Sequence, residues 1–199
     1  MTIEAPTPRG PLVAILAAGS ARRFGGAKLD APLGKRAVGA WVLASAADSG
    51  FDVAIVTGPG PPSFARTAGQ SPGTSLITNP RAADGMGTSV ACAARAAIAG
   101  GHSGMVVLLA DMPFIDGGAL NGLIDPERAV FARHAGDRPG PPAWIPERLL
   151  PRLCDLTGER GARSVLGPDE LALIDWPPDQ LFDIDTPEAL DRARRRIGC

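Results

Sequence analysis

The chain has 199 residues, of which 45% are hydrophobic and 21% are charged, and its formal net charge is −1 at pH 7. This balance argues against a nucleic-acid binder or a protein drawn to anionic membranes, since either would carry a strongly basic surface. No apolar run approaches the about 20 residues that cross a bilayer, and the first residues lack the basic start and apolar core of a secretion signal.

The cysteines indicate a reducing compartment. Cys92, Cys154 and Cys199 are far apart in the sequence and form no CxxC pair, which fits free thiols better than a disulfide framework or a thiolate metal site. The length suits one domain with a substantial core, and no repeat or linker divides the chain. We therefore expect a cytoplasmic protein with a single domain over residues 1–199.

The first 125 residues predict strands that alternate with helices. Expected strands cover residues 12–18, 52–58, 75–79 and 104–113, and expected helices cover residues 37–50 and 85–101, with a loop over 58–73 that has room for a short helix only. Residues 12–18, LVAILAA, form an uninterrupted apolar run, a pattern typical of a strand buried on both faces of a parallel sheet, and residues 104–113 form the most apolar strand of the four. We therefore predict an α/β fold with three α/β/α layers and a doubly wound, mostly parallel sheet.

The remaining elements are less regular. Strands are expected over residues 129–136 and 171–176, and helices over residues 146–156 and 186–197. The last helix begins with Thr186 as its expected N-cap, has proline in its first turn and ends in arginines, as the helix macrodipole favours.

The stretch VAILAAGSARRFGGAK, residues 13–28, places a basic glycine-rich loop directly after the first expected strand. A P-loop would need a hydroxyl residue after the lysine, where this chain has Leu29, and the dinucleotide fingerprint would need a second closely spaced glycine. A loop in this position can still present backbone N–H groups to a polyphosphate while Arg23 and Lys28 neutralise its charge. Lys35 is the only other lysine, so Lys28 does not come from a lysine-rich background.

The segment LAAGSARRFGGAK resembles the signature L-A-[AG]-G-x-x-x-R-[MF]-G-x-x-K of the MobA-like nucleotidyltransferases, and most closely that of the molybdenum cofactor cytidylyltransferases. The resemblance implies a Rossmann-like nucleotidyltransferase fold of the GT-A type, with Arg23 and Lys28 as the catalytic residues. The chain departs from many relatives at Ala21, where they carry serine, although Ser20 is adjacent.

Two further segments resemble the same family. NPRAADGMGTSV resembles N-P-x-x-x-x-G-[ML]-x-x-S, which implies that Asn79 reaches the nucleotide and that the backbone near the glycines reads base and ribose. The residues alone allow a plain helix start capped by Thr88 or Ser89. LLADMP resembles the D-x-P that ends a central strand, where a hard carboxylate such as Asp111 suits Mg²⁺; a turn cap before Pro113 is the alternative.

The segment FDIDTPEAL resembles D-[IV]-D-T-P-E-D-L and implies Asp185 as the second metal ligand, with Asp183 as the other possibility. Ala189 stands where the family has an acidic residue, and Asp185 could instead belong to the cap of the last helix. The stretches 136–144 and 156–166 resemble acceptor-side segments, but no single residue there is assigned a role.

Taken together, the resemblance implies metal binding by Asp111 and Asp185. It implies nucleotide binding by Leu16, Ala17, Ala18, Gly19, Arg23, Lys28, Asn79, Gly85, Ser89 and Asp111. The N-terminal half would bind the nucleotide and the C-terminal half the acceptor.

The function that this resemblance implies is Mg²⁺-dependent transfer of a nucleotide, CMP from CTP, to the phosphate of molybdopterin with release of pyrophosphate. Ala18 favours the cytidylyl branch, because the guanylyl branch more often has glycine there. A phosphate monoester acceptor has a second pKa near 6 and needs no general base at pH 7, in agreement with the position of His102 and His134 outside the strongest motifs. A molybdenum hydroxylase or its maturation factor is the expected partner.

Two alternatives stay open on the sequence. In the first alternative the protein is a nucleotidyltransferase whose acceptor is another phosphorylated small molecule, since related folds act on several substrates. Otherwise the protein is a non-catalytic maturation factor that carries a cofactor or nucleotide to a molybdoenzyme.

Overall fold

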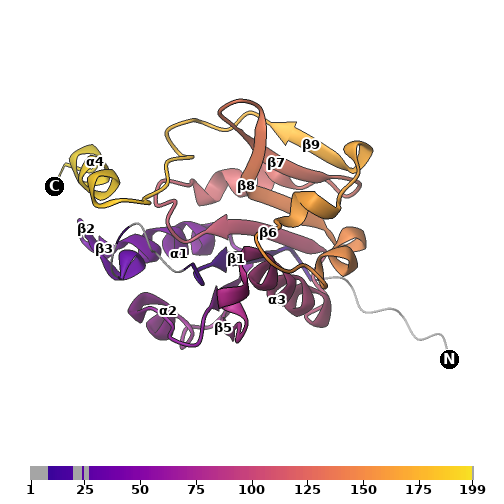
Figure 1. The fold of residues 1–199 in the computed structure, drawn as a ribbon, viewed down its shortest axis with the longest axis horizontal. Coiled ribbons are helices and arrows are strands. Elements are labelled where there is room, and N and C mark those ends of the chain that lie inside the picture. The colour runs from indigo at the N-terminus through magenta and orange to yellow at the C-terminus, as the bar shows by residue number, and fades with distance from the viewer. Residues whose placement is uncertain (1–8, 20–23, 25–26, 199) are drawn as a thin grey trace.

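The computed structural model describes residues 9–19, 24 and 27–198 and contains a seven-stranded sheet in the order β5-β4-β1-β6-β8-β7-β9 (Figure 1). Its strands are β1 (Leu12–Leu16), β4 (Asp52–Thr57), β5 (Thr74–Thr78), β6 (Gly104–Leu109), β7 (Ala129–His134), β8 (Arg138–Pro146) and β9 (Leu171–Ile174). Only β8 runs antiparallel to its neighbours β6 and β7 within this sheet, and the other neighbouring pairs are parallel. The prediction of a mostly parallel sheet is therefore confirmed.

Helices cover both faces of this sheet. The α-helices are α1 (Val38–Asp48), α2 (Ser63–Ala68), α3 (Met86–Ala99) and α4 (Pro187–Arg196), and the 3₁₀ helices are η1 (Lys28–Asp30), η2 (Ala82–Asp84), η3 (Gly117–Leu123), η4 (Glu147–Leu153), η5 (Ala162–Val165) and η6 (Pro168–Glu170). A short hairpin of β2 (Pro32–Leu33) and β3 (Arg36–Ala37) precedes α1.

The side chains of β1 alternate between two hydrophobic clusters. Val13 and Ile15 pack with residues of α1, α2 and η3, whereas Ala14 and Leu16 pack with residues of α3 and η4. A strand with both faces buried needs apolar residues at every position, which explains the uninterrupted run in the sequence. The three-layer arrangement predicted from that run is confirmed.

The C-terminal half differs from the prediction in two elements. The chain over 146–156 contains the 3₁₀ helix η4 with Pro151 inside it, rather than an α-helix. The strand β8 was not expected, because its sequence RPGPPAWIP is rich in proline, which cannot donate a ladder hydrogen bond. Pro139 pairs with β7 alone, Pro141 and Pro142 fall at an irregularity in the pairing with β7, and Pro146 pairs with β6 alone, so no proline of β8 is paired on both sides.

The final helix begins as predicted. The Thr186 side chain accepts a hydrogen bond from the Ala189 amide at 3.2 Å, and Arg194, Arg195 and Arg196 lie in the last turn of α4. The Arg194 guanidinium donates to the Pro32 carbonyl oxygen, so the end of the chain packs on the β2–β3 hairpin. This contact returns the C-terminal segment to the region of the glycine loop.

The described part of the chain contains no helix that is both long and apolar enough to cross a membrane. Cys92 and Cys154 are free, and Cys199 lies outside the described residues.

The contact between α1 and η3 leads to a stability prediction. A Cβ atom at Gly117 would lie 1.8 Å from the carbonyl oxygen of Ser45, and backbone atoms cannot yield as a flexible side chain does. We expect Gly117→Ala to lower the free energy of unfolding by about 1–3 kcal/mol, as measured by urea denaturation.

The matched control is Gly122→Ala in the same 3₁₀ helix, where a Cβ meets no atom within 4 Å. This variant should stay within about 0.5 kcal/mol of the wild type. Equal losses in the two variants would contradict the close approach of α1 and η3.

Candidate active site

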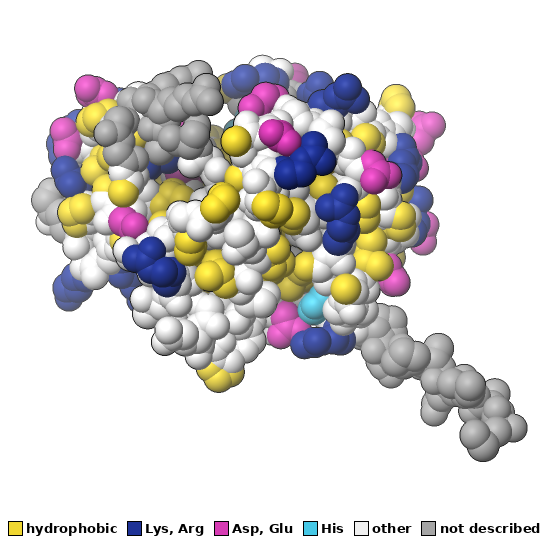
Figure 2. All heavy atoms as spheres, turned by 60° about the horizontal axis from the view of Figure 1, so that its bottom comes forward, with side chains coloured by type: hydrophobic (Ala, Val, Ile, Leu, Met, Phe, Trp, Pro, Cys, Tyr) yellow, Lys and Arg dark blue, Asp and Glu magenta, His cyan; other side chains and the backbone are white. Residues whose placement is uncertain are grey.

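A cleft of about 510 Å³ opens at the carboxyl ends of β1 and β6 and at the start of α3. Its lining residues are Leu16, Ala17, Ala18, Gly19, Lys28, Leu29, Ala82, Ala83, Gly85, Met86, Ser89, Leu109, Ala110, Asp111 and Glu159. Open α/β sheets bind ligands in the crevice outside the carboxyl ends of their strands. Basic and acidic side chains are interspersed on the face of the molecule that Figure 2 shows.

The Lys28 ammonium lies between two carboxylates in this region. Its Nζ donates to Asp111 Oδ2 at 2.6 Å and to Asp185 Oδ1 at 3.1 Å. The Lys28 side chain is 10% exposed, against 19% for Asp111 and 46% for Asp185. Three segments that are distant in the sequence therefore meet at one buried cation.

The local structure around each residue explains this meeting. Lys28 opens the short helix η1, and Asp111 lies two residues beyond the end of β6. Asp185 is brought to Asp111 because the Ile184 amide donates to the Asp111 carbonyl oxygen at 3.0 Å. Ile184 is fully buried and packs with Leu33 and Leu190 of the β2–β3 hairpin and α4, so the packing of the C-terminal helix holds Asp185 in place.

Burial and charge act against each other in the acid–base properties of the cluster. Burial alone would lower the pKa of Lys28, but the charges and hydrogen bonds of Asp111 and Asp185 outweigh it and hold that pKa above its ordinary value. Burial raises the pKa of Asp111, which the Lys28 ammonium offsets only in part, and the charge of Asp185 adds to the rise. Lys28 therefore remains a cation at neutral pH.

The two carboxylates fit a divalent cation that shares its ligands with a substrate. The Asp111 Oδ1 atom is buried and has no hydrogen-bond partner within the described residues, which leaves a hard oxygen available for a metal. The described residues contain no group of three or more His, Cys, Asp or Glu side chains that could hold an ion without help. Mg²⁺ is commonly bound by one or two carboxylates together with substrate phosphates and waters, and Asp111 with Asp185 suits that arrangement.

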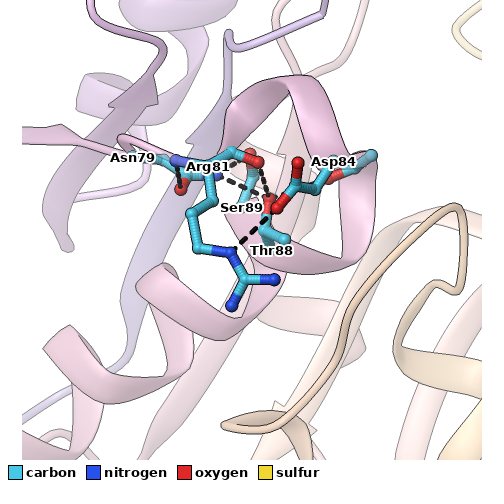
Figure 3. A network of polar contacts seen from close by, with 6 residues as sticks. Asn79, Arg81, Asp84, Thr88 and Ser89 are labelled. Atoms are coloured by element: carbon cyan, nitrogen blue, oxygen red, sulfur yellow. Dashed lines mark hydrogen bonds and ion pairs between the residues drawn. The ribbon is translucent and has the colours of Figure 1, made fainter.

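Asn79 is not one of the residues that line the cleft, and Figure 3 shows its side chain among Arg81, Thr88 and Ser89. Its side chain is 1% exposed, and its Nδ2 donates to Thr88 Oγ1 at 2.8 Å and to Ser89 Oγ at 3.0 Å. Its Oδ1 accepts from the Arg81 amide at 2.9 Å. Both polar groups of this side chain serve the loop and the first turn of α3, an arrangement that fits a positioning role, and the direct contact with the nucleotide that the resemblance implies stays a prediction.

The start of α3 also differs from the helix cap considered above. Gly85 is the N-cap residue and no side chain caps the helix. The Thr88 hydroxyl lies 2.9 Å from the Arg81 carbonyl oxygen and 2.8 Å from that of Gly85, so it binds backbone acceptors rather than the orphan amides that a cap would satisfy.

The other expected nucleotide-binding residues of the described chain line the cleft, and they are Leu16, Ala17, Ala18, Gly19, Lys28, Gly85, Ser89 and Asp111. Arg23 lies outside the described residues. Asp185 contacts Lys28, whereas Asp183 is exposed. Glu159 also lines the cleft, from a loop of the C-terminal half. No motif in the sequence assigns this residue a role.

The fold and the cleft define an α/β protein with a charged site at the carboxyl ends of its strands, and comparison with known proteins places it among the nucleotidyltransferases. The MobA-like NTP transferase domain matches residues 13–173. The chain therefore belongs to the MobA-like NTP transferase family.

Individual relatives agree with this assignment. The purine catabolism protein PucB of Bacillus subtilis (strain 168) is 32% identical over 198 residues, which cover 92% of this chain and 95% of that protein. The structure of Rv0371c from Mycobacterium tuberculosis H37Rv superposes with a TM-score of 0.74 at 23% identity, covering 95% of this chain and 99% of that one. A manganese complex of Rv0371c gives a TM-score of 0.69 at 24% identity, covering 95% and 100%.

A third similar protein is the molybdopterin-guanine dinucleotide biosynthesis protein A of Archaeoglobus fulgidus. Its structure superposes with a TM-score of 0.65 at 22% identity, covering 94% of this chain and 98% of that one.

The network around Asn79 leads to a prediction that separates positioning from direct contact. Asn79→Ala removes the donor shared by Thr88 and Ser89 and should lower the free energy of unfolding by about 1–3 kcal/mol. Thermal or urea denaturation measures this loss. The control is Arg81→Ala, which removes an exposed ion pair with Asp84 and should cost about 0–1 kcal/mol.

An unchanged stability in Asn79→Ala, together with weaker nucleotide binding, would contradict the positioning role and restore a direct contact.

Proposed function

We propose that the protein is a Mg²⁺-dependent nucleotidyltransferase that transfers CMP from CTP to the phosphate of molybdopterin and releases pyrophosphate. The observation that carries the proposal is the cluster of Lys28, Asp111 and Asp185 at the cleft, in which one oxygen of Asp111 is buried without a partner. In this proposal residues 1–199 form one MobA-like domain. Its N-terminal half binds the nucleotide and its C-terminal half binds the acceptor.

The proposed reaction is an in-line displacement at the α-phosphate. An oxygen of the acceptor phosphate forms a bond to the α-phosphorus, and the bond to the oxygen that bridges the α- and β-phosphates breaks, so pyrophosphate leaves with that oxygen. Because a phosphate monoester is largely ionised at pH 7, no residue needs to remove a proton. Such reactions depend on positioning and on stabilisation of developing negative charge.

Lys28 and Arg23 supply this stabilisation in our proposal. Two of the three N–H donors of the Lys28 ammonium are used by Asp111 and Asp185, and we assign the third to a phosphate oxygen of the nucleotide. The arginine is assigned from the loop signature alone. Mg²⁺ held by Asp111 and Asp185 would neutralise phosphate charge and polarise the α-phosphate.

The remaining assignments concern the nucleoside. The backbone of Leu16, Ala17, Ala18 and Gly19 follows β1 into the cleft, and Gly85 and Ser89 face it from α3. Amides at these places suit the recognition of phosphate, ribose and base edges. In this proposal Asn79 positions Ser89 by donating a hydrogen bond to its hydroxyl.

The relatives support the acceptor class and the metal. The Archaeoglobus protein is named for molybdopterin-guanine dinucleotide biosynthesis, which supports a molybdopterin acceptor and makes GTP the competing nucleotide; Ala18 favours CTP. The manganese complex of Rv0371c supports a divalent cation. We further propose that the protein acts in the cytoplasm and that its product serves a molybdenum hydroxylase, directly or through a maturation factor.

The role of Lys28 is tested by its replacement with methionine. Lys28→Met keeps the apolar stem but removes the charge between two carboxylates, and we expect the rate of pyrophosphate release to fall about 100- to 1,000-fold. Lys35→Met is the matched control, because Lys35 is the only other lysine and is exposed. Wild-type turnover in Lys28→Met, with the fold verified by circular dichroism, would disprove the assignment.

The nucleotide is tested by pyrophosphate release from CTP, GTP, ATP and UTP with Mg²⁺ and molybdopterin, for the wild type and Asp111→Asn. We expect release with CTP, dependent on Mg²⁺ and lost in the variant, because the amide of asparagine lacks the charge that holds the cation. Release with GTP alone would keep the mechanism and overturn the choice of base. Nucleotide binding without any release would instead indicate another acceptor or a carrier protein.

A further inference from the structure

The cleft contains one acidic side chain that the proposed chemistry does not use. Glu159 lies on the loop of residues 157–160 between η4 and η5, and it lines the cleft together with Ala82 and Ala83 of η2 and Met86 at the start of α3. Within the described residues, no hydrogen bond or ion pair of its side chain is found. An acidic side chain at a ligand cleft, on a loop from the opposite half of the chain, is a candidate for substrate selection.

The loop that carries Glu159 is fastened to α3 through its backbone. The Gly87 amide donates to the Gly158 carbonyl oxygen at 2.8 Å. A Cβ at Gly85 would lie 2.4 Å from the carbonyl carbon and oxygen of Gly158, and one at Gly87 would lie 2.7 Å from the Arg160 carbonyl oxygen. Because the residues on both sides of Glu159 pack against glycines that admit no side chain, the backbone of Glu159 is held at the cleft.

The charge of Glu159 restricts what it can contact. A carboxylate accepts hydrogen bonds and donates none, and it repels the phosphates that Lys28 attracts. The part of a substrate beside Glu159 must therefore be uncharged or cationic and must present N–H or O–H donors. The amino-substituted rings in the proposed reaction meet this condition at their N–H edges.

We infer that Glu159 is a specificity-determining residue that accepts hydrogen bonds from the amino-bearing edge of a substrate heterocycle. This inference rests on the proposed function. Two sources share the chemistry, namely the 4-amino group of cytosine and the 2-amino group of the pterin with its adjacent ring N–H. Uracil has a carbonyl oxygen in place of the cytosine amino group, so it would meet the carboxylate as acceptor against acceptor.

The test compares Glu159→Ala and Glu159→Gln with the wild type in steady-state pyrophosphate release. Loss of a hydrogen bond to a charged group should raise one KM about 10- to 100-fold in Glu159→Ala, while kcat at saturation stays within about twofold. Glu159→Gln keeps an acceptor oxygen without the charge and should show a smaller rise. Glu147→Ala is the matched control, because Glu147 is an exposed glutamate of the same half that is not among the residues lining the cleft.

The pattern of change identifies the source. A higher KM for CTP with a reduced preference for CTP over UTP assigns the contact to the nucleobase. A higher KM for molybdopterin with an unchanged KM for CTP assigns it to the pterin. Unchanged KM values, or a fall in kcat alone, overturn the inference.

A binding experiment separates failure of this inference from failure of the proposed function. Calorimetry with CTP and UTP in the presence of Mg²⁺, and fluorescence titration with 6-hydroxymethylpterin, require no turnover. If the wild type binds these ligands but transfers no nucleotide, the proposed function fails, and weaker binding to Glu159→Ala still supports the contact. If both ligands bind Glu159→Ala as tightly as the wild type while transfer proceeds, the inference fails and the function stands.

Discussion

The site depends on one buried cation, the Lys28 ammonium, and on the two carboxylates that neutralise it. Removing an ammonium from water costs several kcal/mol unless good partners replace the solvent, and Asp111 and Asp185 do so at 2.6 and 3.1 Å. This requirement ties together the loop after β1, the end of β6 and the segment before α4. Two features of the fold bring these segments together. The strands β1 and β6 are neighbours in the sheet, and α4 packs on the β2–β3 hairpin.

A second constraint is the close approach of backbone segments, which joins the two halves of the chain around the cleft. The loop that carries Glu159 packs closely against Gly85 and Gly87, and the backbone of Ser45 in α1 packs closely against Gly117. At each of these places the absence of a Cβ allows a distance that a side chain would prevent. The proposed nucleotide side and the proposed acceptor side are therefore joined by packing, and residues of both line the cleft.

The accuracy of the sequence prediction follows the strength of the local signals. The buried strands β1, β4 and β6 are largely apolar runs in the sequence, and Thr186 caps α4 as its sequence indicates. The strand β8 was not predicted because its prolines argue against a strand, and the sheet tolerates them because none is paired with both β6 and β7. Asn79 matched a motif, but a motif does not tell whether a polar side chain faces the ligand or the protein interior.

The sequence by itself determined the α/β alternation, the basic loop after the first strand and the family to which that loop points, because these are properties of adjacent residues. The tertiary structure alone decided that Asp185 rather than Asp183 contacts Lys28, that the Asn79 side chain binds Ser89 of α3, and that Glu159 lines the cleft. Lys28 and Asp185 are 157 positions apart, and contacts across such separations are set by the packing of helices on the sheet, which no local pattern records.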